Sequence, residues 1–155
     1  PFAPWAARSA RQASWDGKAV LALVDPEEGL LEQSRALREV AGILLLEALP
    51  PGLDPGPWLA ELSSSQLVLL DGREGGGDAL EAAARAAGVV YGRVAGTLGG
   101  ADGRRVAWAL TQRRGAGVVV VEASEEGLAE LEGFVQASRE VGFALVLPTE
   151  ALRLP

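Results

Sequence analysis

One pattern recurs along this chain and constrains its fold more than any other feature. A short run of Val and Leu is followed by an acidic residue or a Gly-rich turn, then by a helix-like stretch, then by another apolar run. The clearest runs are 19–25, 66–71 and 117–122. Because neighbouring parallel strands need connections long enough to hold a helix, this alternation predicts a parallel α/β sheet.

The full set of apolar runs predicts about six strands with helices between them. The clearest helix is 27–41, where apolar residues recur at helical spacing on one face. The expected strands are 19–25, 43–49, 66–71, 89–95, 117–122 and 143–147. The other expected helices are 57–62, 78–87, a segment that contains Val106, Trp108 and Leu110, and 124–141.

Six such strands fit two architectures. We expect an open, doubly wound, mainly parallel sheet with helices on both faces, which is a Rossmann-like arrangement. The alternative is a partial (βα) barrel, since a complete one typically needs about 250 residues and this chain has 155. Residues 18–155 are expected to form a single α/β domain, preceded by an N-terminal arm or short helix at 1–17.

The composition removes several kinds of chemistry. The chain has no His, Cys, Met or Asn, which excludes disulfides, Cys/His metal sites and His general bases. The absence of the thermolabile residues Cys, Met and Asn fits a thermophilic source. The excess of Arg over Lys and the single Ile, Ile43, fit a GC-rich coding bias equally well. Acidic and hydroxyl side chains, arginines, one Lys (Lys18) and one Tyr (Tyr91) remain for any chemistry.

Charge and hydropathy bear on partners and location. A net charge of −7 disfavours general nucleic-acid binding, which needs a basic face. No apolar run reaches the roughly 18 residues of a membrane span, and the N-terminus lacks the layout of a signal peptide. We therefore expect no membrane span and a cytoplasmic protein. The start at Pro1 fits both a processed N-terminus and a domain cut from a larger protein.

Acidic residues lie at the carboxyl ends of several expected strands. Asp25, Asp71 and Glu122 share this position, and in a parallel sheet such ends lie along one edge. Carboxylate oxygens suit Mg²⁺, so these three residues are candidate metal ligands. The alternative is that they favour the N-termini of the following helices. No other cofactor is implied.

Two Gly-rich loops each follow a strand and precede a helix. Backbone N–H groups in such loops can bind a phosphate or another anion. Neither loop matches the P-loop, which needs a Lys, or the dinucleotide fingerprint, and glycines also make tight connections. The candidate binding residues are Gly72, Arg73, Gly75, Gly76 and Gly77 in the first loop and Gly96, Thr97, Gly99 and Gly100 in the second.

Two functions follow from these features. The first is a non-catalytic α/β binding or assembly module with a protein partner or a homo-oligomeric state, either free or as a domain of a larger protein or complex. The second is a domain that binds a nucleotide or other phosphate-bearing ligand at the Gly-rich loops, which includes the case of a Mg²⁺-dependent enzyme. The sequence leaves open whether the protein is catalytic.

Overall fold

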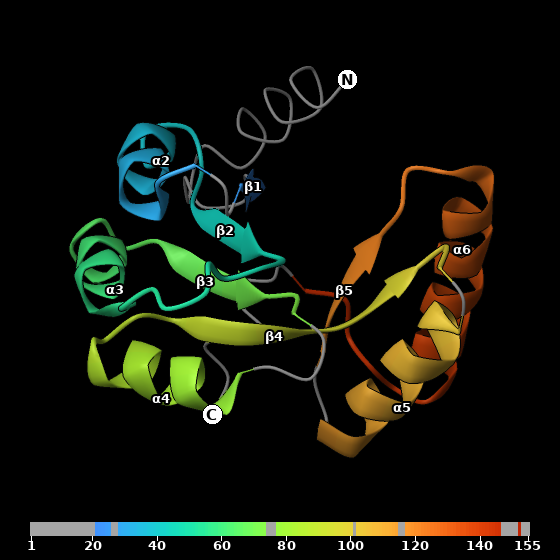
Figure 1. Ribbon diagram of the computed structural model, residues 1–155. Coiled ribbons are helices and arrows are strands. Elements are labelled where there is room, and N and C mark those ends of the chain that lie inside the picture. Colours follow the sequence, from blue (N-terminus) through green and yellow to red (C-terminus); the bar gives the residue numbers. More distant parts are fainter. Residues whose placement is uncertain are drawn as a thin grey trace. The chain divides into compact units, whose positions relative to one another are not determined.

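The computed structural model describes residues 21–25, 28–73, 77–100, 102–114, 117–146 and 152, so the expected arm at 1–17 lies outside the described residues. Contacts divide the chain into two compact units, the first ending at Gly92 and the second beginning at Arg93. The single-domain prediction for 18–155 stays a prediction. The elements are β1 Leu21–Val24, α2 Leu30–Leu37, β2 Ile43–Leu46, α3 Gly56–Ser64, β3 Val68–Asp71, α4 Asp78–Ala86, β4 Tyr91–Leu98, α5 Gly103–Arg114, β5 Val118–Val121 and α6 Glu125–Glu140 (Figure 1).

The strands confirm a parallel α/β fold and correct the expected sheet. Strands β1 and β2, β2 and β3, and β4 and β5 pair in parallel. The strand order is β1-β2-β3-β4-β5, which follows the chain. A doubly wound sheet requires the order to reverse at a switch point, whereas a (βα) barrel places its strands in chain order. The partial-barrel alternative therefore fits, and the doubly wound arrangement does not.

The prediction of six strands was wrong. Within the described residues there are five strands, and the described part of the expected sixth strand, 143–146, has no strand conformation. Phe143 instead packs edge-on against Trp108 of α5, with ring centroids 6.4 Å apart, while Leu145 and Val146 are exposed. A run of β-forming residues becomes a strand only where it pairs and packs, which is why propensity alone misplaced this segment.

The first unit has one apolar layer between its strands and its helices. Val24, Leu44 and Leu69 point from β1, β2 and β3 into a cluster that also contains buried residues of α2, α3 and α4. The three helices thus cover the same strand face (Figure 1), as right-handed crossovers between strands in chain order require. Every residue of β2 and β3 is buried, which is typical of parallel strands covered on both faces.

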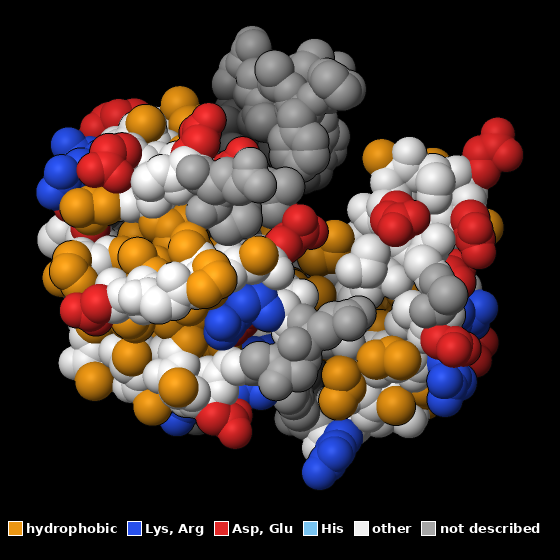
Figure 2. Space-filling view, in the orientation of Figure 1, with side chains coloured by type: hydrophobic (Ala, Val, Ile, Leu, Met, Phe, Trp, Pro, Cys, Tyr) orange, Lys and Arg blue, Asp and Glu red, His pale blue; other side chains and the backbone are white. Residues whose placement is uncertain are grey.

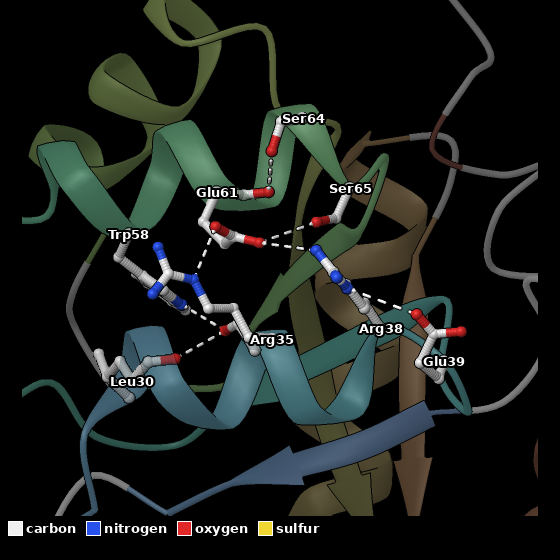
Figure 3. Close-up of polar contacts among 9 residues, drawn as sticks. Leu30, Arg35, Arg38, Glu39, Trp58, Glu61, Ser64 and Ser65 are labelled. Atoms are coloured by element: carbon white, nitrogen blue, oxygen red, sulfur yellow. Dashed lines mark hydrogen bonds and ion pairs between the residues drawn. The ribbon is translucent and has the colours of Figure 1, made fainter.

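Polar contacts tie α2 to α3 at the outer side of this layer (Figure 3). The buried Ser34 hydroxyl accepts a hydrogen bond from Trp58 Nε1 at 2.7 Å and donates one to the Leu30 carbonyl at 2.8 Å. Nearby, Glu61 accepts a hydrogen bond from Arg35 Nε at 3.1 Å, and this bond lowers the pKa of Glu61 below its ordinary value. These contacts fix how the two helices lie against each other.

The second unit is a βαβα segment with its own apolar cluster. Its two strands pair in parallel with an irregular register between Val94 and Gly96. At Gly96 the strand approaches α5 so closely that a methyl group there would lie 3.0 Å from the Ala107 side chain. The cluster centres on Leu98, Ala107 and Phe134. Among the described residues, no helix is long and apolar enough to cross a membrane.

Candidate functional site

The end of β3 holds a buried carboxylate in a close set of partners. The side chain of Asp71 is 1% exposed and that of Arg73 is 19% exposed. Arg73 Nε donates to Asp71 Oδ1 at 2.9 Å and Arg73 Nη2 donates to Oδ2 at 2.7 Å, while the Arg73 backbone N–H donates to Oδ1 at 3.1 Å. The hydroxyl of Tyr91, at the start of β4, donates to Oδ2 at 2.7 Å.

These contacts keep both members of the pair charged. Burial raises the pKa of Asp71, but the hydrogen bonds from the Arg73 guanidinium, the Tyr91 hydroxyl and the Arg73 backbone outweigh it, so the pKa lies below its ordinary value. The hydrogen bond to Asp71 raises the pKa of Arg73. A carboxylate with two side-chain donors and a backbone donor is stabilised as an ion, so it is a poor proton acceptor near neutral pH.

The first Gly-rich loop starts at this pair, and two of its described backbone N–H groups donate hydrogen bonds within the chain. The Gly72 N–H donates to the Leu46 carbonyl of β2 at 2.8 Å, and the Arg73 N–H donates to Asp71. Gly77 precedes α4 with a positive φ of 133°, while Gly75 and Gly76 lie outside the described residues. The predicted binding residue Arg73 and the predicted metal ligand Asp71 thus contact each other directly.

The second Gly-rich loop carries carboxylates of its own chain. The Gly99 N–H donates to Glu130 Oε2 of α6 at 2.5 Å. A methyl group built on Gly99 would lie 3.1 Å from a carboxylate oxygen of Glu122, so two acidic side chains approach this loop. The Glu130 carboxylate occupies the position that an external anion would take on this N–H, and the second carboxylate opposes negative charge there.

Several glycines of the second unit are explained by packing. Gly96 and Thr97 lie within β4, beyond the end expected for that strand. A side chain at Gly103, the first residue of α5, would collide with the Thr97 carbonyl oxygen, whereas the nearest atom to a methyl group on Gly100 would be 3.9 Å away. Close backbone approach therefore requires glycine at Gly103, and the local space does not require it at Gly100.

The three candidate metal ligands lie at strand exits as predicted. Asp25 follows β1, and its backbone N–H and carbonyl form hydrogen bonds with the side-chain amide of Gln33 in α2. Glu122 follows β5 and is exposed. Among the described residues, no group of three or more acidic side chains is arranged to hold a metal ion. Metal binding by Asp25, Asp71 and Glu122 stays a prediction.

A surface cavity of about 430 Å³ lies between α5 and α6. Its floor is aromatic, because Trp108 and Phe134 pack edge to face with centroids 5.7 Å apart. The guanidinium of Arg104 lies over Gly133 of α6, where a methyl group would be 2.8 Å from Nη1. The described lining residues are Asp102, Arg104, Arg105, Trp108, Glu130, Phe134 and Ala137.

Sequence reasoning missed two partners in these sites. Glu130 is 31 residues from the glycine that it contacts, and no local signal marks it within an ordinary amphipathic helix. Tyr91 is 20 residues from Asp71. It is the only Tyr in the chain, but its hydrogen-bond partner can be identified only when the neighbouring strands are known.

No protein-family model, curated protein or solved structure matches this chain.

Proposed function

We propose that this chain is a non-catalytic binding and assembly module. The first support is that the groups best placed for chemistry already form hydrogen bonds with other groups of the chain. Asp71 accepts hydrogen bonds from Arg73 and Tyr91, and the Gly99 N–H donates to Glu130. Side chains held in this way stabilise the fold, and a substrate would have to displace them before they could act on it.

The observation that carries the proposal is exposed apolar surface in the second unit. Leu128 on α6 is 61% exposed, and Val141, Leu145 and Val146, which follow that helix, are each about half exposed. Val141, Leu145 and Val146 lie within six residues of each other, whereas Leu128 lies about 20 Å away along α6. Large apolar side chains near one another at a surface mark interaction sites more often than single ones do. On the face visible in Figure 2, acidic and basic side chains are interspersed, which fits a protein partner better than a nucleic acid.

Sedimentation velocity tests this proposal. The wild-type chain is compared with the Leu145→Ser/Val146→Ser variant from about 1 μM to about 1 mM, the range of weak protein association. We expect concentration-dependent association of the wild type and its loss in the variant, with circular dichroism unchanged because both side chains are exposed. A wild-type chain that remains monomeric throughout would contradict the assembly role.

The cavity between α5 and α6 favours a second function, the binding of a small phosphate-bearing ligand. It combines an aromatic floor with the guanidinium of Arg104, and such a pairing suits a planar anion. Thermal melting with nucleotides, with and without Mg²⁺, tests it, because a ligand that binds only the folded chain raises the melting temperature. Arg104→Gln should abolish any increase, and no increase at millimolar nucleotide would rule this function out.

A further inference from the structure

The outward face of α6 carries an alternating stripe of apolar and charged side chains. Leu128, Glu132, Val135 and Arg139 follow each other at spacings of four, three and four residues, which places them on one side of the helix. Phe134, the neighbour of Val135 and about 100° away from it around the helix, is buried and packs into the core of the second unit. All of the stripe is exposed except the half-buried Val135.

The two charges of this stripe have opposite sign and no partner within the described residues. Glu132 and Arg139 are absent from every ion pair of the described part of the chain. Seven residues separate them, or about 10 Å along the helix. The midpoint of this interval falls between Val135 and Gln136. Glu132 and Arg139 are therefore equally distant from this midpoint, and the apolar Val135 lies beside it.

This arrangement is complementary to itself when the helix is turned around. A twofold axis through the midpoint sets two copies of α6 antiparallel, with Glu132 of each chain opposite Arg139 of the other. The same operation brings Val135 of both chains next to the axis. Isologous contacts of this kind are the commonest way in which proteins form dimers. A parallel arrangement would instead place like charges opposite each other.

We propose that α6 pairs antiparallel with α6 of a second copy of this chain, held in register by two Glu132–Arg139 ion pairs across a central Val135 contact. This inference rests on the proposed assembly role and names its partner. One helix pair buries less surface than a standard stable interface, so the dimer should be weak and concentration-dependent. Leu128 adds apolar contact toward the C-terminal end of the partner helix.

Charge reversal tests the register. Glu132→Arg creates two Arg–Arg contacts in the dimer, and Arg139→Glu creates two Glu–Glu contacts. Each variant alone should weaken self-association roughly tenfold or more, because two attractive contacts become repulsive. An equimolar mixture of the two variants should form a heterodimer, because each ion pair is restored with its charges exchanged. Glu126→Arg is the matched control; it makes the same charge change on α6 outside the stripe and should leave association unchanged.

Sedimentation velocity on the wild type, the single variants, their mixture and the control separates the possible failures. If the wild type associates but neither reversal weakens it, or if the mixture fails to recover association, the α6 pairing is wrong. If the Leu145→Ser/Val146→Ser variant loses association and neither charge reversal does, the assembly role is supported but the α6 pairing is wrong. A wild-type chain that is monomeric at every concentration overturns both.

Discussion

Replacing Arg73 by Gln should destabilise the chain at neutral pH. The change removes two charge-assisted hydrogen bonds from the buried Asp71 carboxylate. Breaking a buried ion pair from one side costs about 3 to 5 kcal/mol. We expect the lower end, about 3 kcal/mol, because the carboxylate keeps the Tyr91 hydroxyl and a backbone N–H. At roughly 2 to 4 °C per kcal/mol for a chain of this size, the melting temperature should fall by about 6 to 12 °C.

The pH dependence distinguishes this reasoning from a general loss of packing. In the wild type, the lowered pKa of Asp71 gives stability that is present above the unfolded-state pKa of about 3.9 and is lost as the pH falls through the folded value. In Arg73→Gln, fewer hydrogen bonds offset the cost of burying the ionised Asp71 carboxylate, so the pKa of Asp71 should rise. Protonation of Asp71 at low pH then removes the buried charge and with it part of the loss of stability. The difference in unfolding free energy between the wild type and Arg73→Gln should therefore be smaller at pH 3.5 than at pH 7.

Urea denaturation followed by circular dichroism at pH 7 and pH 3.5 provides the measurement. Arg35→Gln is the matched control, because Arg35 also pairs with a carboxylate but its side chain is 56% exposed. That change should cost about 1 kcal/mol or less. Equal losses in the two variants, or a difference for Arg73→Gln that does not change with pH, would refute the assignment of the stability to a buried charge pair.

Three further substitutions test contacts that the fold depends on. Tyr91→Phe should cost about 1 to 2 kcal/mol by thermal melting, because it removes a donor to a buried carboxylate; no loss would show that the hydroxyl is dispensable. Ser34→Ala should cost about 1 to 3 kcal/mol, because it leaves a buried indole N–H without its acceptor, while the exposed Ser64→Ala should cost almost nothing. Gly103→Ala should destabilise by about 1 to 3 kcal/mol or more through collision with a backbone oxygen, whereas Gly100→Ala should stay within about 0.5 kcal/mol; similar losses in both would contradict the packing explanation.

Local sequence patterns identified most elements because each signal lies within a few residues. Strands rich in Val and Leu, such as Ile43–Leu46 and Val118–Val121, form where the apolar runs predict them. Ser124 was expected to begin α6, and its hydroxyl accepts a hydrogen bond from the Gly127 N–H as an N-cap. The segment at 143–146 shows where the same reasoning fails, because a strand also needs a neighbour to pair with.

The sequence by itself determined the class of the fold, the types of chemistry that the chain lacks and the placement of acidic and glycine residues at strand exits. All of these follow from composition and from short-range periodicity. Only the tertiary structure decided that the strands lie in chain order, that Tyr91 donates a hydrogen bond to Asp71, and that Glu130 accepts one from the Gly99 N–H. Those partners are brought together by strand order and helix packing, and contacts between residues 20 or 31 positions apart leave no mark on the local pattern of either segment.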